Sequence, residues 1–318
     1  MLQEFIYAFN FAVSVTVPSI YLLMFGYFLR YSGQIDNIFC HQASKLMFNW
    51  ALPALLFFSI LESKVSFSGQ IKLISSGAIV ATVLFISSEI VAAIWIKEKI
   101  NRSVFVQGVY RGNTAIIGLA FCANAYGNDG VAIGAIFTGS MTFLYNILAV
   151  ITLTRSIENQ QNNFATMLFN MLKNPLIIAI VAAIFLRIIG ITLPKTFSQS
   201  GNYLANISLP LALICIGASF DLKSIFLKRD FAFWSSVLRV TVSPALAIIL
   251  GLLFKLETKE FGVLFLMSAT PVAAAAFVMV KAMGGNDRAM ANVIALTTVL
   301  SMFTASIWIS LLRFYQLM

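Results

Sequence analysis

Apolar segments of about twenty residues recur along the whole chain, and this feature constrains the fold more than any other. A helix of that length spans the roughly 30 Å hydrocarbon core of a bilayer. The 318 residues are 60% hydrophobic and 10% charged, whereas a soluble domain carries about 25% charge. We therefore predict an all-α polytopic membrane protein. Ten transmembrane spans are expected, at residues 5–29, 43–61, 72–96, 104–125, 130–153, 171–191, 202–220, 231–254, 260–282 and 289–312.

The basic residues lie in the short connections between the apolar segments and form no continuous face. The net charge of +9 is therefore interpreted as a topology signal, and no nucleic acid partner is predicted. Alternate connections hold twelve and seven Lys and Arg residues. The positive-inside rule places the twelve in the cytoplasm and both termini outside, in an inner or plasma membrane. No cleavable signal peptide is expected, because the first apolar segment lacks a basic region before it.

Residues that bind metals or act in catalysis are scarce. The three cysteines, Cys40, Cys122 and Cys215, are far apart, and His41 is the only histidine. These spacings predict neither a metal site nor a disulfide framework, and no cofactor is expected. An enzyme is disfavoured, because the sequence has no HExxH motif, no intramembrane carboxylate pair and no Ser/His arrangement.

Two short motifs repeat at nearly the same offset. Asn49-Trp-Ala-Leu-Pro53 matches Asn206-Ile-Ser-Leu-Pro210 after 157 residues, and Gly127-Asn128-Asp129 matches Gly285-Asn286-Asp287 after 158. We predict two five-span repeats, residues 1–154 and 171–318, joined by a polar cytoplasmic linker at 155–170. An odd number of spans makes the second repeat enter the membrane from the opposite side, an inverted arrangement that is typical of secondary transporters.

The fourth and ninth spans each contain helix-breaking residues at one repeat position. Thr270-Pro271 resembles a helix start with a Thr cap, and Asn113 is the equivalent cap in the fourth span. Irregular backbone within a membrane is tolerated only in protein or beside a cavity, and a half-helix N-terminus attracts anions. We therefore expect the breaks to meet and bind a small organic anion, although two kinks repaired by neighbouring hydroxyl groups are the alternative. The predicted substrate-binding residues are Gly112, Asn113, Thr114, Ser268, Thr270 and Pro271.

Other polar residues and prolines lie inside the spans. Pro53 and Pro210 are interpreted as structural kinks. The predicted lining of the cavity consists of Asn49, Asn206 and Asn146.

Three charged residues, Glu89, Arg111 and Arg239, lie at similar depths within their spans. An intramembrane charge is costly and is retained for a reason. We expect Glu89 to pair with Arg111 or Arg239, which leaves one guanidinium to attract the substrate. The alternative is that each Arg extends to the cytoplasmic interface.

Three segments resemble the auxin efflux carrier family, which includes plant PIN carriers and microbial malate or malonate permeases. Residues 44–60 (SKLMFNWALPALLFFSI) are similar to its second helix, residues 111–127 to its fourth and residues 268–285 to its ninth. The resemblance spans nearly the whole chain. It implies a fold like that of the bile acid sodium symporters, with a scaffold domain from spans 1, 2, 6 and 7. Spans 3–5 and 8–10 would form a transport domain that moves like an elevator, with spans 4 and 9 crossing beside the substrate.

This chain departs from the family pattern at two points. Plant carriers have Pro at both breaks, whereas the first break here has Asn113, and the long regulatory loop of plant carriers is absent. Sodium coupling is disfavoured, since the ninth span has no carboxylate before Asp287, while proton coupling, uniport and exchange stay open. A homodimer and a monomer are both compatible with the sequence. The predicted function is transport of a mono- or dicarboxylate such as malate, malonate or an auxin-like acid, and the alternative is a membrane sensor with the same fold.

Overall fold

The computed structural model describes residues 2–62, 70–156, 175–191, 193–218 and 230–318, so most of the predicted linker lies outside the described residues. Within these ranges the chain is helical apart from short connections. The elements are α1 (Leu2–Tyr31), α2 (Asn37–Leu46), the π-helix η1 (Met47–Ala51), α3 (Leu52–Glu62), α4 (Gln70–Trp95), α5 (Lys99–Tyr110), the π-helix η2 (Thr114–Gly118), α6 (Leu119–Ser156), α8 (Pro175–Ile189), α9 (Lys195–Asn206), α10 (Ser208–Ala218), α11 (Phe231–Leu253), α12 (Thr258–Ser268), α13 (Ala274–Ala282) and α14 (Asp287–Phe314).

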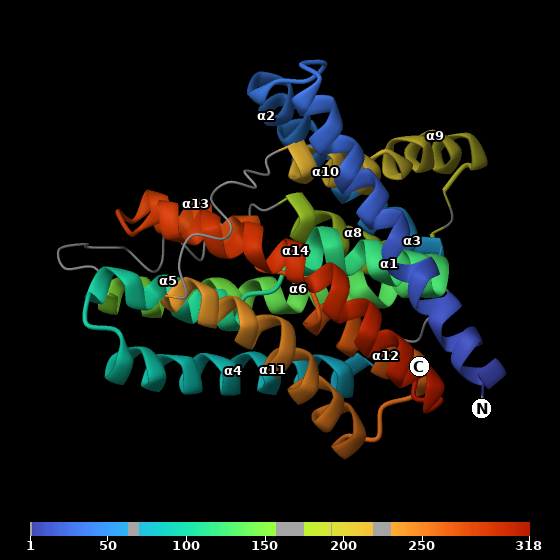
Figure 1. The fold of residues 1–318 in the computed structure, drawn as a ribbon. Helices are drawn as coiled ribbons and strands as arrows, with labels where there is room; N and C mark the ends of the chain where they lie inside the picture. The colour runs from blue at the N-terminus through green and yellow to red at the C-terminus, as the bar shows by residue number, and fades with distance from the viewer. Residues whose placement is uncertain (1, 63–69, 157–174, 192, 219–229) are drawn as a thin grey trace.

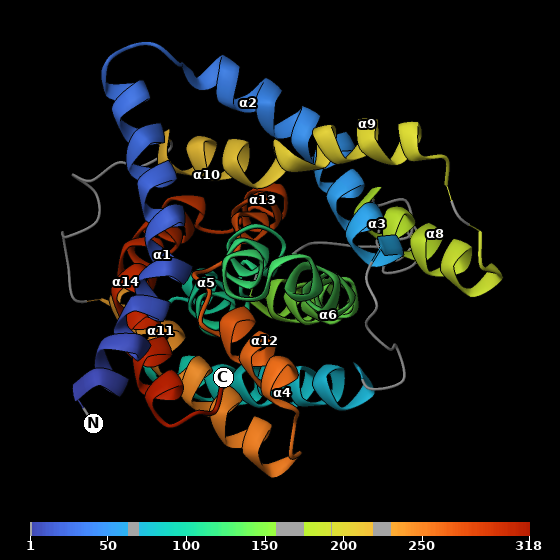
Figure 2. The ribbon, with the colours of Figure 1, turned by 90° about the vertical axis from the view of Figure 1, so that its right-hand side faces the viewer.

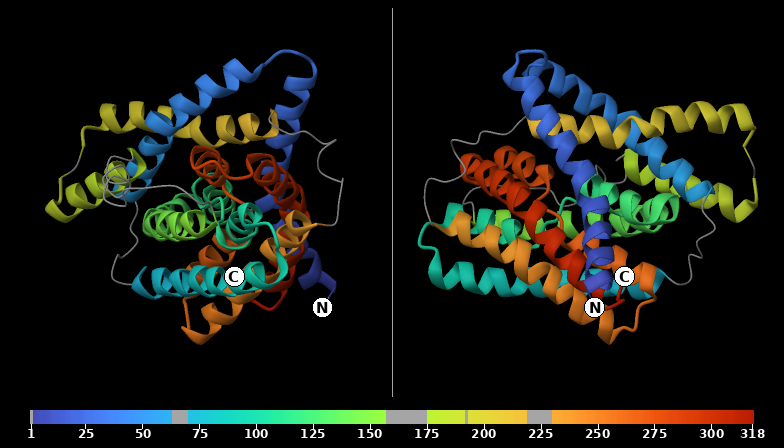
Figure 3. Two further views of the ribbon diagram at one scale, coloured as in Figure 1. Left: turned by 90° about the vertical axis from the view of Figure 1, so that its left-hand side faces the viewer. Right: turned by 45° about the vertical axis from the view of Figure 1, so that its right-hand side comes forward.

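The helices form two groups (Figure 1). The first group contains α1, α2, η1, α3, α8, α9 and α10, and the second contains α4, α5, η2, α6 and α11 to α14. Figure 2 shows the first group as an arc around one side of the second, in whose middle α5, α6, α12 and α13 lie. Two further directions show the same separation (Figure 3). Helix α1 packs against α10 in its own group and against α6 and α14 in the other, so it connects the two groups.

Among the described residues, seven helices are long and apolar enough to cross a membrane, and α8 is a shorter apolar helix. Large apolar side chains cover the outside of these helices; Ile94, Ile188 and Leu253 are 82%, 74% and 69% exposed. A soluble protein does not expose apolar surface on this scale, whereas bilayer hydrocarbon solvates it. The chain is therefore a multi-pass membrane protein.

The ten expected spans do not appear as ten long helices, because the fourth and ninth are divided and the described helix of the sixth, α8, is short. The fourth consists of α5 and of a second part that begins at Thr114, and the ninth consists of α12 and α13. The second part of the fourth span runs into the fifth as one element, with a bend at Gly127. At Gly127 φ is +59° and ψ is −143°, a backbone conformation that glycine adopts without a Cβ clash. This residue therefore marks the boundary that the sequence predicts near residues 125–130.

The second and seventh spans are irregular one turn before their prolines. Pro53 follows the π-helix η1, which contains Asn49, and Pro210 follows the break between α9 and α10, next to Asn206. Proline has no N–H, so it cannot bond to the carbonyl four residues earlier. For Pro53 and Pro210 these carbonyls belong to Asn49 and Asn206, which explains why the regular hydrogen-bond pattern is lost there.

Candidate binding site at the crossing of two broken helices

The two breaks meet in the middle of the second helix group. The Asn113 N–H donates to the Pro271 carbonyl at 2.8 Å, and the Ala273 N–H donates to the Arg111 carbonyl at 3.1 Å. Between these bonds, Gly112 and Val272 form an isolated antiparallel bridge. The crossing therefore joins the break of the fourth span to that of the ninth through backbone hydrogen bonds.

The hydrogen bonds at the crossing provide partners for only some of the backbone N–H and C=O groups at the two breaks. The Val272 N–H donates to Thr297 Oγ1 at 3.1 Å, but the first amides of a helix have no partner within it. In α13 the first two amides are those of Ala274 and Ala275, and both residues are exposed. In η2 they begin at Thr114, which is buried. Both helix starts carry partial positive charge, and that of α13 is open to its surroundings.

The opposite ends of the broken helices are held by Arg239, a residue of α11 that is 1% exposed. Its Nη1 donates to the Tyr110 carbonyl at 3.1 Å and its Nη2 to the Ser268 carbonyl at 3.0 Å. Its Nε donates to the Thr270 carbonyl at 2.8 Å. Since α5 ends at Tyr110 and α12 ends at Ser268, one guanidinium binds the carbonyl ends of both first halves. The remaining contacts are with Val109 O, Ser243 Oγ and Thr270 Oγ1.

Three predicted binding residues, Gly112, Ser268 and Thr270, lie on the Arg239 side of the crossing. Gly112 has no room for a side chain, because a Cβ there would overlap Arg239 Nη2 and lie 2.7 Å from Thr270 Oγ1. Thr270 is fully buried, and its hydroxyl donates to the Met267 carbonyl at 2.8 Å. The prediction that Thr270 caps a new helix is wrong, because α13 begins only at Ala274. The bridge to residues 111–113 holds the intervening residues extended.

Arg111 is 4% exposed and has only neutral partners among the described residues. Its Nη1 donates to Gln107 Oε1 and Met279 Sδ, both at 3.0 Å, and its Nη2 donates to Asn146 Oδ1 at 2.6 Å. An arginine has five N–H groups, so Nε–H and one Nη2–H are not used. The Nε–H lies on the edge of the planar group where a carboxylate can bind side-on. The Gln107 Nε2 is buried and also lacks a partner in the described structure.

Glu89 pairs with neither Arg111 nor Arg239, so this part of the charge prediction is wrong. Its Oε2 lies 3.7 Å from Nη1 of Arg155, in the last turn of α6. The side chain of Arg155 is 67% exposed and that of Glu89 is 20% exposed. The sequence indicates the position of each residue along its helix, but the direction of each side chain around its helix decided the partner.

Because the Arg155 side chain of this ion pair is largely exposed and its nitrogen lies 3.7 Å from the carboxylate, we expect the pair to contribute little stability. The Arg155→Gln substitution should change the free energy of unfolding by less than about 1 kcal/mol. Thermal unfolding of the purified protein in detergent measures this change. A much larger loss would show that Arg155 compensates a buried charge.

The two guanidinium groups bring positive charge to the crossing, and only that of Arg239 is offset by the carbonyl ends of the broken helices. In the part of the chain that the structure describes, neither Arg111 nor Arg239 lies within ion-pair distance of a carboxylate. A buried charge without a counter-charge is strongly unfavourable. The Asn113 side chain, 7% exposed, also makes no hydrogen bond with another described residue. The arrangement is therefore suited chemically to bind an anion with hydrogen-bond acceptors.

A cavity of about 270 Å³ lies between the two helix groups. Asn206 lines this cavity, together with Asn124, Asn128 and Ser19, and the Ser19 hydroxyl is buried without a partner among the described residues. The remaining lining is mostly apolar and comes from α1, α3, α6, α9 and α10. Asn49 is exposed and lines neither this cavity nor the apolar groove between α3, α8 and α9.

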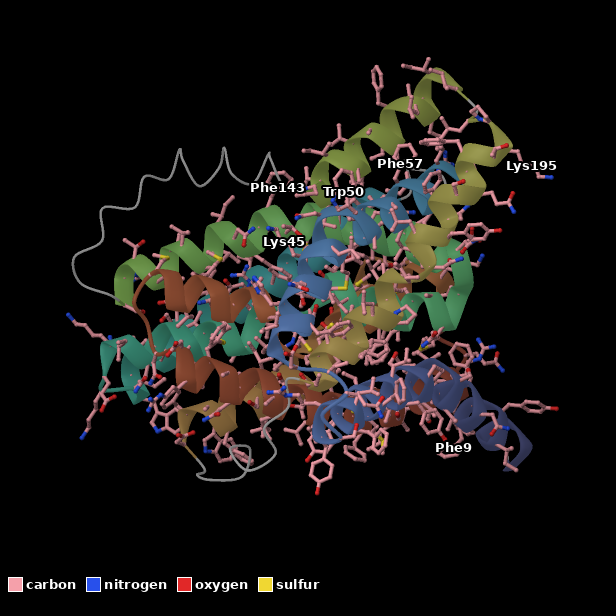
Figure 4. The ribbon with its side chains drawn as sticks, turned by 90° about the horizontal axis from the view of Figure 1, so that it is seen from above. Phe9, Lys45, Trp50, Phe57, Phe143 and Lys195 are labelled. Atoms are coloured by element: carbon pink, nitrogen blue, oxygen red, sulfur yellow. The ribbon has the colours of Figure 1, made fainter. Side chains whose placement is uncertain are left out.

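An apolar groove of about 460 Å³ lies on the first helix group, between α3, α8 and α9. Trp50 and Phe57 line it and follow one another along η1 and α3 (Figure 4). Ser200 is the one polar residue in this lining as the structure describes it. Such a surface contacts lipid in a membrane, so we do not assign it to the anion site.

Sequence reasoning missed Gln107 and Met279, although both contact Arg111. Gln107 precedes Arg111 by one helical turn, which places the two side chains on the same face of a helix and was a usable signal. Met279 lies 168 residues further along the chain, in α13, and only the crossing brings it near Arg111.

Comparisons with known proteins match the chain over almost its full length. A family model described as membrane transport protein matches residues 12–309. An uncharacterized transporter of Methanocaldococcus jannaschii is 25% identical over 312 residues, covering 93% of this chain and 97% of the relative. An uncharacterized transporter of Escherichia coli is 22% identical over 317 residues, covering 96% of this chain and 98% of the relative.

Proposed function

The chain belongs to the membrane transport protein family, the auxin efflux carrier family that its motifs indicate, and on this premise we propose that it transports a small organic anion. The substrate class is a mono- or dicarboxylate. The observation that carries this proposal is the buried Arg111, which has no carboxylate partner in the described structure and lies beside the crossing of two broken helices. An anion supplied from solution would provide the missing counter-charge.

The contacts of the bound carboxylate follow from the unused donors. One carboxylate would accept from Nε–H and Nη2–H of Arg111, and the exposed amides at Ala274 and Ala275 would add partial positive charge. Asn113 and Thr114 lie at the start of the other half-helix and would supply further contacts to the same carboxylate. Gly112, Ser268, Thr270 and Pro271 would hold the crossing in shape and would not touch the substrate.

We further propose that transport uses ten spans in two inverted repeats and an elevator motion. The second helix group would be the transport domain, and the first would be the scaffold. Support comes from the meeting of the two breaks, which lie in the fourth and ninth spans and are joined by backbone hydrogen bonds. The cavity of about 270 Å³ between the groups would be part of the access path from outside the cell. In this proposal, Asn146 acts by orienting Arg111, and both termini lie outside.

A screen of carboxylates on the purified protein tests this proposal. A carboxylate that binds only the folded protein will raise the midpoint of thermal unfolding, since binding stabilises the folded state. Carboxylates that raise the midpoint are then measured for uptake into proteoliposomes, with protein-free vesicles as the control. We expect saturable uptake of at least one of them. Stabilisation without any uptake would replace the carrier by a sensor, and no stabilisation by any carboxylate would contradict the anion site.

A further inference from the structure

The negative ends of the two broken helices are both turned toward Arg239. Its guanidinium binds the carbonyls of Val109 and Tyr110 at the end of α5, and those of Ser268 and Thr270 at the end of α12. No carboxylate takes part among the described residues. All six of its hydrogen bonds end on backbone carbonyls or on the hydroxyls of Ser243 and Thr270.

The charges of this arrangement balance. A helix carries about half a negative elementary charge at its C-terminus and half a positive charge at its N-terminus. The ends of α5 and α12 together therefore carry about one negative charge, equal and opposite to that of Arg239. The starts of η2 and α13 and the charge of Arg111 have no such partner in the described structure.

We infer that Arg239 is a positioning residue that makes the crossing selective for negative charge without touching the ligand. It neutralises the carbonyl ends of both first halves, so the exposed start of α13 presents a net positive potential. Without the positive charge of Arg239, the negative carbonyl ends of α5 and α12 would cancel much of the positive potential at the start of α13, where the ligand would bind. This inference deepens the proposed function and rests on it, because it concerns the same anion site.

The potential at the start of α13 can be measured without a known substrate. Ala274→Cys places a thiol at this exposed position, in a full chain whose Cys40, Cys122 and Cys215 are replaced by alanine. The rates of modification by methanethiosulfonate ethylsulfonate, an anionic reagent, and by its cationic ethyltrimethylammonium analogue are compared. Their ratio reports the local electrostatic potential, because the thiol is the same in both reactions.

We expect the anionic reagent to be favoured and Arg239→Gln to lower the ratio of rates by at least about threefold. Arg239→Lys, which retains the charge but loses the planar set of donors, should keep the ratio and lower the stability. Arg288→Gln, a substitution at an exposed arginine of α14, should change neither the ratio of modification rates nor the stability of the protein. A purely structural Arg239 would lower stability in both of its variants and leave the ratio unchanged, which would overturn the inference.

Arg239→Gln is expected to destabilise the protein, so a second variant addresses the same question. Ser243→Asp places a carboxylate one helical turn from Arg239, where Ser243 Oγ now accepts a bond at 3.1 Å. It neutralises the charge while all guanidinium donors remain, and the ratio should fall as for Arg239→Gln. An unchanged ratio overturns the inference alone. Failure of both reagents to modify the thiol would instead show that this helix start is closed to water, which contradicts the proposed anion site as well.

Discussion

Arg111→Gln will lower carboxylate uptake into proteoliposomes by between about 10-fold and 100-fold. A hydrogen bond to a charged group contributes about 1.5 to 3 kcal/mol, and each 1.4 kcal/mol is a factor of ten. Glutamine removes the charge and the two unused donors, so the loss should appear mainly as a higher KM. Initial rates over a range of substrate concentrations separate KM from the maximal rate.

Arg288→Gln is the matched control for Arg111→Gln, because it removes the same charge from an exposed position at the start of α14. Uptake by this variant should equal that of the unmodified chain. Unaltered KM and rate in Arg111→Gln would remove Arg111 from the substrate site.

Gly112→Ala will lower the midpoint of thermal unfolding in detergent by at least about 4 °C. The added methyl group would overlap Arg239 Nη2 and crowd Thr270 Oγ1. The guanidinium cannot move without losing hydrogen bonds to the ends of α5 and α12. Overpacking of this kind costs about 1 to 3 kcal/mol, and the lost charged hydrogen bonds add to it.

Gly139→Ala provides the control for Gly112→Ala. A Cβ at Gly139 would lie 2.8 Å from Cδ1 of Ile180, the flexible end of a side chain that can move. The midpoint of thermal unfolding of Gly139→Ala should fall by less than half of the decrease expected for Gly112→Ala. Equal shifts in the two variants would show that Arg239 is not held rigidly at the crossing.

The sequence predicted the membrane class and the meeting of the breaks for separate physical reasons. Hydrocarbon requires long apolar helices, so their composition is visible in any window of about 20 residues. The breaks were visible because Gly, Pro and Thr interrupt two such helices at one repeat position. In both cases the signal is local along the chain and needs no knowledge of side-chain direction.

The details of the site required the three-dimensional structure. Depth along a helix placed Glu89, Arg111 and Arg239 at one level, but it did not give their direction around each helix. Arg239 therefore binds carbonyls of the crossing, and Glu89 reaches the end of α6 instead. The role of Thr270 was misjudged because the capping pattern is short, and the bridge between Gly112 and Val272 overrides it.

The most direct test is an experimental density map of the protein with the carboxylate that stabilises it most. We expect density for a carboxylate within hydrogen-bond distance of Nε of Arg111 and beside the amides of Ala274 and Ala275, and no such density in Arg111→Gln. Density for the ligand elsewhere, with Arg111 still bonded only to Gln107, Met279 and Asn146, would contradict it.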